Sequence, residues 1–383
     1  MKVSVLAEQL RRPVPGGIGT YAGGLLQGLR TSGASGISLL ATRAPARPVK
    51  HLPTGSSGPS DPLSQLGFPL RTIGLPSAAF TRLADLGLVV LRPGGRWLES
   101  DISVVHSVSS LTARVERVAL TATVHDLAWR RFPETFPRRG RAWHEAALRR
   151  VAGRAERIVV PSDATAADLL GAGLGVAPDR IVVIPEGVDH LAPLDNAARS
   201  AAASVLAALG LGSRHYLLCV GTLEPRKNLH RLLEAYELAA SRLRDPPALV
   251  VVGPKGWGRR LRPPPGAVLA GRVTDVELTG LYAGAIALAY VPLAEGFGLP
   301  AAEAMSLGVP VVAGPEVPSA AGAAVEADPW NTESIAAALR RVVVDDDARR
   351  EAVAKGRERS AAYRWEVAAR AHARMWEELS GRG

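Results

Sequence analysis

The chain has 383 residues, too many for one ordinary hydrophobic core and suited to two α/β domains at roughly 150 residues per domain. Hydrophobic residues make up 47% of it beside 39 Gly and 29 Pro, which excludes a disordered chain and allows two cores with many turns. The formal charge is +10, of which residues 1–200 supply +8 through 24 Lys or Arg against 16 Asp or Glu, and such a field attracts nucleic acid, an anionic membrane or an anionic substrate alike.

The composition excludes several further classes. A single cysteine, Cys219, excludes an intramolecular disulfide framework and a Cys/His metal cluster, and it fits a reducing cytoplasm. Residues 1–7 lack a basic region followed by a long apolar one, so they predict a first strand and not a signal peptide. Apolar runs such as Ala283–Leu293 fall short of the ~18 residues that a membrane-spanning helix needs, so any membrane contact is expected to be peripheral.

In the first half, short β-branched runs alternate with helical patterns, which predicts parallel strands covered by helices on both faces. A helix is expected from about Thr20, and residues 44–76, rich in Pro, Gly and Ser, are predicted to form a long loop. The predicted strands are Val3–Leu6, Ser103–His106, Leu120–Val124, Arg157–Val160 and Ile181–Ile184.

An Ala-rich helical stretch from about Leu191 to Arg214 interrupts the alternation and is interpreted as the link between two domains. A second doubly wound series follows, and past Asn331 only helical patterns remain. Its predicted strands are Tyr216–Val220, Ala248–Val252, Val268–Ala270, Ile286–Val291 and Val309–Val312. We therefore predict an N-terminal domain over residues 1–195, a C-terminal domain over 196–362 and a final helix over 363–383.

The final helix carries aromatic residues on one face. Trp365, Ala368, His372 and Trp376 recur at helical spacing, so this face is expected to cover another surface. His372 lies on the same face and is interpreted as a packing residue beside the tryptophans, not as a catalytic group.

Ligands of doubly wound folds bind beyond the carboxyl ends of the strands, so the turns after the strands are where chemistry is expected. The first such turn is Pro15–Thr20, in which Gly16 and Gly17 let backbone amides approach a phosphate at the start of the helix. The alternative is an ordinary tight turn, and the spacing is not that of the dinucleotide motif GxGxxG.

The second turn holds His125 and Asp126, directly after the strand Leu120–Val124. A histidine at this place can donate a hydrogen bond to a sugar hydroxyl or to a developing oxyanion. The alternative is a histidine that bonds to nearby backbone.

The third turn runs from Gly221 to Asn228 and contains Arg226 and Lys227. Asn228 is predicted to be the N-cap of the next helix, which puts both cations at its N-terminus. Cations there oppose the helix dipole and cost stability unless an anion lies among them, so the turn favours a polyphosphate site over a solvated pair.

The fourth turn is the string EGFGLPAAEAM, residues 295–305, which holds two carboxylates. Pro300 suits the first turn of a helix that ends near Gly308, so Glu295 lies on the loop and Glu303 in the helix. A glycosidase needs two carboxylates that flank one bond, whereas a loop carboxylate and a helix carboxylate are better suited to binding the hydroxyls of a sugar or a ribose.

These motifs, taken in order along the chain, resemble the retaining glycosyltransferases of family 4, which have the GT-B fold. The resemblance implies two Rossmann-like domains that face a cleft, with the C-terminal helix returning to the N-terminal domain. The matching strings are GGIG at 16–19, HD at 125–126, IVVIPEGVD at 181–189, GTLEPRKNL at 221–229, LTGLYAGA at 278–285 and EGFGLPAAEAM at 295–305.

The resemblance implies roles for the residues of these strings. Glu295 and His125 would contact the donor sugar, Glu303 the ribose, and the backbone amides of residues 297–299 (Phe297, Gly298 and Leu299) the sugar and phosphate. Gly16, Gly17 and Gly221 would also lie against the donor. Arg226 and Lys227 would stabilise the diphosphate leaving group in place of a metal, so neither a metal nor another cofactor is expected.

The donor and the acceptor are less well defined by the resemblance. The stretch HDLAWRRFPETF, residues 125–136, looks most like members that use GDP-mannose, so a GDP-mannose donor is ranked first and a UDP-sugar second. The loop after Val312 lacks the family's usual serine-rich stretch, which predicts an altered wall behind the donor. The acceptor hydroxyl is unidentified and is expected near Gly17 and the 44–76 loop.

Two alternatives remain open. A nucleotide-sugar-modifying enzyme on the same fold, such as a 2-epimerase, would need acid and base groups around the sugar ring that the motifs do not supply. A membrane- or nucleic-acid-binding protein would use the arginines of one predicted amphipathic helix, without the aromatic ladder of nucleic-acid binders. As an accessory role, docking on an anionic membrane that carries a lipid-linked acceptor is considered, with a cytoplasmic enzyme peripheral to the inner face of the cell membrane.

Overall fold

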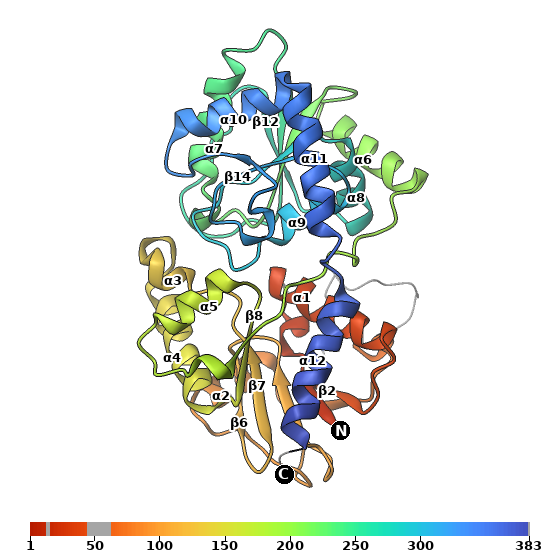
Figure 1. Ribbon diagram of the computed structural model, residues 1–383, viewed down its shortest axis with the longest axis vertical. Helices are drawn as coiled ribbons and strands as arrows, with labels where there is room; N and C mark the ends of the chain where they lie inside the picture. The colour runs from red at the N-terminus through yellow and green to blue at the C-terminus, as the bar shows by residue number, and fades with distance from the viewer. Residues whose placement is uncertain (13–15, 44–62, 382–383) are drawn as a thin grey trace. The chain divides into compact units, whose positions relative to one another are not determined.

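The computed structural model describes residues 1–12, 16–43 and 63–381 and divides into two compact units (Figure 1). The first unit comprises Met1–Leu127, Arg138–Gly187 and Arg364–Gly383, and the second comprises Ala128–Pro137 and Val188–Tyr363. The ten residues Ala128–Pro137 thus belong to the second unit although first-unit segments flank them on both sides. Both units are parallel-sheet α/β structures.

The described part of the first unit contains a seven-stranded parallel sheet in the order β3-β2-β1-β5-β7-β8-β9 and a small two-stranded sheet. Its strands are β1 Val3–Leu6, β2 Ile37–Thr42, β3 Leu70–Ile73, β5 Val104–Ser107, β7 Ala119–Thr123, β8 Arg157–Val160 and β9 Ile181–Val183, with β4 Val90–Leu91 and β6 Arg114–Val115 in the small sheet. The central strands are apolar runs because helices bury both faces of a parallel sheet, and all four residues of β1 are buried.

The predicted loop over residues 44–76 is wrong at its end, and one strand before it is missed. Residues 44–62 lie outside the described residues, whereas 63–76 contain the 3-10 turn Ser64–Leu66 and strand β3. Strand β3 lies at the sheet edge, and only Ile73 of its four residues is buried, so its apolar pattern is weak. Strand β2 is fully buried, and its short apolar run gives no periodicity to distinguish it from a helix segment.

The helices of the first unit are α1 Gly16–Thr31, α2 Ser77–Asp85, α4 Arg138–Arg154, α5 Asp163–Leu170 and α12 Trp365–Ser380. Helix α1 begins at Gly16, so the GGIG string forms its first turn and does not precede it. Helix α12 packs on α1 in this unit, and the prediction of an aromatic face that covers another surface is confirmed (Figure 1). Trp365, His372 and Trp376 are all buried, and the predicted packing role of His372 is confirmed by its contact with Trp376, with 5.6 Å between ring centroids.

The described part of the second unit contains a six-stranded parallel sheet in the order β12-β11-β10-β13-β14-β15. Its strands are β10 Tyr216–Val220, β11 Ala248–Val252, β12 Ala267–Gly271, β13 Ala287–Ala289, β14 Val311–Ala313 and β15 Val325–Glu326. Its helices are α3 Ala128–Arg131, α6 Asn196–Ala208, α7 Leu229–Ala240, α8 Asp275–Gly284, α9 Leu299–Ser306, α10 Thr332–Val344 and α11 Asp346–Ser360. Two apolar clusters, one packed by α6, α8 and α9 and one by α7 and α10, complete the core.

Candidate active site

The two loops that carry the predicted cations and carboxylates of the second unit follow neighbouring strands. Strand β10 pairs with β13, so the loop after Val220 lies beside the loop that leads to Glu295. The backbone amide of Leu293 donates to the carbonyl of Arg226 at 2.9 Å, which joins the two loops directly. Carboxyl ends of adjacent parallel strands therefore bring these motifs together, although about 70 residues of chain separate them.

Asn228 occupies the predicted N-cap position of α7, but it fixes the first of these loops by other contacts than a capping bond. It precedes α7 in a left-handed conformation with φ 59°, and its side chain caps no helical amide. The side-chain amide instead donates to the carbonyls of Val291, at 3.0 Å, and Pro329, at 2.7 Å. Asn tolerates left-handed backbone better than most residues, and here it holds the cation loop against the end of the neighbouring strand.

Arg226 and Lys227 both contact the carboxylate of Glu295. Nζ of Lys227 lies 2.5 Å and Nη1 of Arg226 3.1 Å from the same oxygen, Oε1. Arg226 also pairs with Glu224, with 2.9 Å between Nη2 and Oε1, and Lys227 donates to the Tyr290 hydroxyl at 2.9 Å. Two cations and two carboxylates therefore balance each other in a largely buried cluster.

Glu295 is held in its ionised form. Burial by itself would raise the pKa of this carboxyl, but the charges of Arg226 and Lys227 outweigh burial and lower the pKa to about 2. The hydrogen bonds from Lys227 and Tyr290 act in the same direction. Glu295 is thus an acceptor only, as a residue that binds hydroxyl groups must be.

Gly221 lies where the cation loop leaves β10. Its amide donates to the carbonyl of Val252 at 2.9 Å, and a Cβ at this position would lie 3.4 Å from Cε of Lys227. The backbone of Gly221 thus runs along the aliphatic part of the Lys227 side chain. This places Gly221 beside the cation pair and next to the site that the sequence predicts for a polyphosphate.

The turn at Phe297, Gly298 and Leu299 leaves backbone amides available. Within the described part of the chain, the amide nitrogens of these three residues donate to no protein acceptor. Gly298 has φ 96°, and a Cβ there would lie 2.5 Å from Cγ1 of Val317, so the turn requires glycine. Three unpaired amides at the start of α9 suit a ligand oxygen, since unpaired donors at a helix start attract anions.

The loop after β14, which departs from the family pattern in sequence, supports this turn. The Ser319 amide donates to the carbonyl of Phe297 at 2.9 Å, and its hydroxyl donates to the carbonyl of Gly298 at 2.8 Å. Nε of Arg359 donates to the carbonyl of Ser319 at 2.6 Å. Whether this loop alters the wall behind the donor stays a prediction, but its contact with residues 297–298 is direct.

Glu303 is buried one helical turn further along α9, and both of its oxygens are bound. Tyr282 donates its hydroxyl to Oε2 at 2.7 Å, and Nε2 of His190 lies 3.1 Å from Oε1. Burial would lower the pKa of His190, but the hydrogen bond and charge of Glu303 outweigh it and raise that pKa. A hydroxyl of a ligand would share these oxygens through their remaining lone pairs.

The other predicted residues lie in the first unit. His125 follows β7, and its imidazole packs perpendicular to the ring of Tyr21, with 4.7 Å between ring centroids and 83° between the ring planes. Its Nε2 lies 2.9 Å from the carbonyl oxygen of Val108, and its Nδ1 lies 3.4 Å from Oε1 of Glu186. The ring therefore contacts backbone, the alternative weighed for this residue, and a carboxylate that the sequence did not single out.

Gly16 and Gly17 begin α1 at the carboxyl edge of the same sheet. Gly16 has φ 62°, a left-handed conformation that glycine adopts without strain. A Cβ at either position would meet no atom within 4 Å, so the space beside them is open. The two glycines and His125 follow β1 and β7, the strands on either side of β5.

Comparison with known proteins agrees with the motifs. The family model described as Glycosyltransferase Family 4 matches residues 15–190, and the one described as Glycosyl transferases group 1 matches residues 208–359. O-antigen chain mannosyltransferase B of Escherichia coli is 33% identical over 277 residues, which are 67% of this chain and 69% of that protein. The chain belongs to glycosyltransferase family 4.

A second relative and two solved structures extend this picture of the glycosyltransferase. D-inositol 3-phosphate glycosyltransferase of Kineococcus radiotolerans is 31% identical over 311 residues, 72% of this chain and 65% of that protein. Anabaena HepE, solved with UDP and glucose, superposes with a TM-score of 0.69 at 17% identity over 99% of this chain and 100% of its own. Sucrose-phosphate synthase of Thermosynechococcus elongatus gives 0.68 at 18% identity and covers 100% of both chains. The glycosyltransferase thus has the GT-B fold.

Several residues of the glycosyltransferase site were not found by sequence reasoning. They are the partners of the predicted residues, namely Glu186, His190, Glu224, Tyr282 and Tyr290. Glu186 and Glu224 do lie inside the strings IVVIPEGVD and GTLEPRKNL, so their motifs signalled the region but not the contact. Tyr282 lies inside the string LTGLYAGA, His190 directly follows IVVIPEGVD, and Tyr290 lies in the predicted strand Ile286–Val291.

Two features bear on the metal and membrane predictions. Among the described residues, no three or more His, Cys, Asp or Glu side chains gather in a way that could hold a metal ion. No helix in this part of the glycosyltransferase is long and apolar enough to span a membrane.

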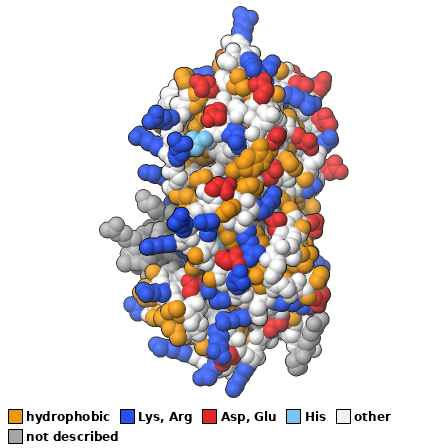
Figure 2. All heavy atoms as spheres, turned by 90° about the vertical axis from the view of Figure 1, so that its left-hand side faces the viewer, with side chains coloured by type: hydrophobic (Ala, Val, Ile, Leu, Met, Phe, Trp, Pro, Cys, Tyr) orange, Lys and Arg blue, Asp and Glu red, His pale blue; other side chains and the backbone are white. Residues whose placement is uncertain are grey.

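The basic helix α4 of the glycosyltransferase is partly neutralised. Arg149 pairs with Glu145 at 2.9 Å, and Arg150 pairs with Asp85 at 2.5 Å. Figure 2 shows Lys and Arg side chains interspersed with acidic and apolar ones on one face of the molecule, without a single continuous basic patch. Docking of α4 on an anionic membrane surface stays a prediction.

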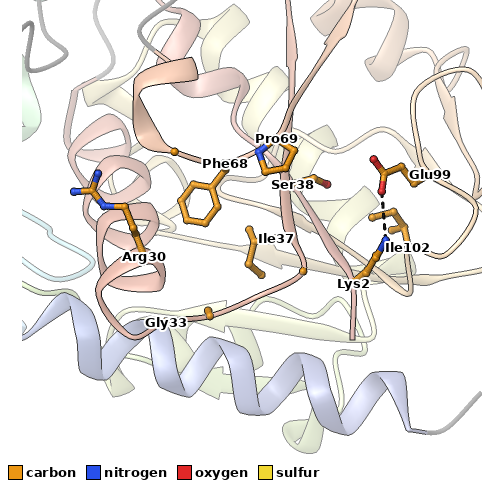
Figure 3. Close-up of a pocket in the computed structure, with 12 residues that line it drawn as sticks. Lys2, Arg30, Gly33, Ile37, Ser38, Phe68, Pro69, Glu99 and Ile102 are labelled. Carbon is orange, nitrogen blue, oxygen red and sulfur yellow. Dashed lines mark ion pairs between the residues drawn. The ribbon is translucent and has the colours of Figure 1, made fainter.

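A separate hollow of about 400 Å³ lies in the first unit of the glycosyltransferase, and Figure 3 shows the side chains around it. Lys2 precedes β1, Ile37 begins β2 and Pro69 precedes β3, so the hollow lies at the amino-terminal edge of the sheet. Lys2 is already paired with Glu99 and with Asp101. The predicted site residues follow the carboxyl ends of the strands, and this hollow is therefore not part of the candidate active site.

Proposed function

We propose that this glycosyltransferase transfers a hexose from a nucleotide-sugar to a hydroxyl of the acceptor, with retention of anomeric configuration and without a metal ion. The observation that carries the proposal is the cluster of Arg226, Lys227 and Glu295 beside the unpaired amides of residues 297–299. It combines cations for a diphosphate with a carboxylate and amides for the transferred sugar.

The chemistry follows from where charge develops. As the glycosidic bond breaks, negative charge grows on the leaving diphosphate, and fixed cations stabilise it more in the transition state than in the ground state. Arg226 and Lys227 would supply this stabilisation in the role that a metal plays elsewhere. Glu295 would bind hydroxyls of the hexose, and Glu303 those of the ribose.

Retention follows from the order of events proposed for the transfer. The acceptor hydroxyl attacks C1 of the sugar on the face from which the diphosphate departs, and the departing phosphate oxygen takes the hydroxyl proton. No separate protein nucleophile is needed. We place GDP-mannose first as donor because residues 125–136 resemble GDP-mannose users and one relative is named a mannosyltransferase, and a UDP-sugar second because HepE was solved with UDP-glucose.

The test is a thermal-shift screen against GDP, UDP, ADP and their sugars, with EDTA present. A ligand that binds only the folded protein stabilises it by about 2.7 kcal/mol at about a hundredfold excess over Kd, which raises Tm by about 5 °C or more. We expect one nucleotide to raise Tm in the wild type, and Glu303→Ala to abolish the shift.

Glu351→Ala is the matched control, because Glu351 is exposed and forms a surface pair with Lys355. The anomeric configuration of the product, read by NMR, then tests retention. No shift with any nucleotide would contradict the proposed donor class, and a shift that needs an added metal would contradict metal independence.

A further inference from the structure

Both ring nitrogens of His125 face hydrogen-bond acceptors of the protein itself. The carbonyl oxygen of Val108 lies 2.9 Å from Nε2, and a carbonyl can only accept, so Nε2 carries a proton. Oε1 of Glu186 lies 3.4 Å from Nδ1, and a carboxylate also only accepts. Neither nitrogen remains directed toward a substrate.

With Glu186 as a carboxylate, only the imidazolium form of His125 satisfies both contacts. A neutral ring protonated at Nε2 would turn the Nδ1 lone pair toward the Glu186 carboxylate, and the other tautomer would turn a lone pair toward the Val108 carbonyl. Burial by itself would lower the pKa of His125, but the hydrogen bond and charge of Glu186 outweigh it and raise that pKa. The contacts and the electrostatics therefore agree.

The other ionisable groups around the ring do not oppose this state. The charge of Asp126 adds to the effect of Glu186 on the pKa of His125. Burial lowers the pKa of His106 well below its usual value, with the nearby histidines acting in the same direction, so His106 stays neutral and brings no competing charge. Burial also raises the pKa of the Tyr21 hydroxyl, so the ring that packs perpendicular to His125 is a neutral phenol.

Tyr21 holds the plane of the His125 ring, and two hydrogen bonds fix the hydroxyl of Tyr21 itself. His372 donates from Nδ1 to the carbonyl of Ala368 at 2.8 Å, so its Nε2 accepts from the Tyr21 hydroxyl at 3.0 Å. The Thr123 hydroxyl lies 2.9 Å from the same oxygen and donates to it. This chain of bonds runs from α12 through α1 to the end of β7, and it leaves the imidazolium one orientation.

Glu186 is the group that makes this arrangement charged. It is 4% exposed, and a carboxylate so deeply buried is costly unless it is paired. We propose that Glu186 is a positioning residue that holds His125 as a fixed imidazolium, so that His125 acts on the substrate as a charge and not through a ring nitrogen. This inference rests on the proposed function and on the contact of His125 with the donor sugar that the resemblance implies.

A consequence for pH follows. A fixed cation stabilises negative charge without reorganisation, and it does so only while it is protonated. Activity should therefore hold at acidic and neutral pH and fall as pH rises through the raised pKa of His125. Without Glu186, only Asp126 and the bond with Val108 still oppose the effect of burial on the pKa of His125, so the same fall should come at lower pH.

The first experiment is NMR of the full chain labelled with ¹⁵N at histidine, with His125 assigned by the signal missing in His125→Gln. In the wild type at pH 7 we expect both ring nitrogens of His125 to be protonated. A neutral ring at pH 7 would overturn the proposal. This measurement needs neither substrate nor a Glu186 variant, so it stands even if the transferase reaction is not the one proposed.

The second experiment compares Glu186→Gln with wild type. The control is Glu116→Gln, since Glu116 forms a surface pair with Arg114 at 3.0 Å. We expect Glu186→Gln to move both the NMR titration of His125 and the falling limb of kcat to lower pH. We also expect kcat at pH 8 to drop by about tenfold. In metal sites of other proteins, loss of a carboxylate that orients a ligand histidine costs about 10–100-fold, and the expected drop is at the lower end of that range. The control should leave all three unchanged.

Other outcomes are equally decisive. An unchanged His125 titration in folded Glu186→Gln would overturn the proposal, as would a uniform loss of kcat with no shift of the pH profile. If Glu186→Gln does not fold, Glu186→Asp keeps the charge at a greater distance and should show a smaller shift in the same direction. Absence of transfer by the wild type would count against the proposed function alone, because the NMR titration decides the pairing independently.

Discussion

Arg226 and Lys227 are neutralised by carboxylates of their own unit before any substrate binds. Glu224 and Glu295 pair with them, and Glu295 stays ionised because the pKa is about 2. A diphosphate must therefore compete with Glu295 for the cations, or Glu295 must turn toward the sugar as the diphosphate arrives. In both cases the carboxylate exchanges a protein partner for a ligand.

Removing the charge of Glu295 should separate binding from transfer. Glu295→Gln changes the net charge of the four-residue cluster from zero to +1, so we expect a nucleoside diphosphate alone to bind about tenfold more tightly, equivalent to about 1.4 kcal/mol. Transfer should be lost, because the amide cannot accept hydroxyls as the carboxylate does. Isothermal titration calorimetry with GDP and UDP measures the first effect, and product formation measures the second.

The matched control for this change is Glu333→Gln, which removes an exposed carboxylate paired with Arg242 in the same unit. It should change neither affinity nor turnover. Weaker binding of the diphosphate by Glu295→Gln would show that the carboxylate orders the cations and does not compete for them.

The sequence identified the charged residues of the second-unit site but not their partners. Arg226, Lys227 and Glu295 lie in the strings GTLEPRKNL and EGFGLPAAEAM. These strings alone indicate a binding site, because few structural roles require such charged residues directly after a strand. The contacts of Glu303 with His190 and Tyr282 join segments more than 20 residues apart in the chain. Only the packing of α8, α9 and the segment before α6 brings these together, and a single sequence carries no signal for it.

At the scale of elements, most strands and both doubly wound units followed from apolar runs, whereas β2, β3 and the short strands did not. Strand β2 has no alternation because both faces are buried, and β3 is a half-exposed edge strand. The start of α1 was placed four residues late because Gly16–Gly19 looks like a turn, and glycine disfavours helix in isolation. Tertiary packing of α12 on α1 overrides that preference.

The glycines of α1 have two different roles, which a pair of substitutions can separate. A Cβ at Gly24 would overlap the indole of Trp365, whereas a Cβ at Gly23 would meet nothing within 4 Å. Gly23→Ala should stabilise by up to about 1 kcal/mol through helix propensity. Gly24→Ala gains the same propensity but forces overpacking of about 1–3 kcal/mol, so we expect a net loss.

Urea unfolding of both variants, followed by far-UV circular dichroism, checks this pair. The neighbouring positions share helix, chemistry and backbone conformation, so the difference between them isolates the contact with Trp365. Equal stabilisation by both substitutions would mean that α12 moves away from α1 at little cost.

At the scale of the whole molecule, buried histidines make the two units respond differently to acid. Burial lowers the pKa of His106 well below its usual value and that of His372 to about 4, and both lie in the first unit. His125, in the first unit, and His190, in the second, have raised pKa values through their carboxylate partners. A histidine with a raised folded-state pKa contributes its full stabilisation below the unfolded-state pKa, near 6.5. Acidification therefore removes no stability through His125 or His190.

A histidine whose folded-state pKa is lowered acts in the opposite direction. Its contribution to the free energy of unfolding is fully present above the unfolded-state pKa and is lost as pH falls. Between pH 6.5 and 4.5, His372 should cost the first unit up to about 1.4 kcal/mol per pH unit, and His106 should add a loss in the same direction. The second unit loses nothing comparable there, because Glu295 titrates with a pKa of about 2 and matters only below the unfolded value near 4.5.

Hydrogen exchange followed by mass spectrometry at pH 6.5 and 4.5, corrected for intrinsic rates, should therefore show protection falling in α1 and α12 while α7 and α9 keep theirs. His372→Gln, which removes one titrating group at the same contact, should reduce the difference. Equal loss in both units would mean that they unfold as one cooperative body, and the local histidines would then set the stability of the whole chain.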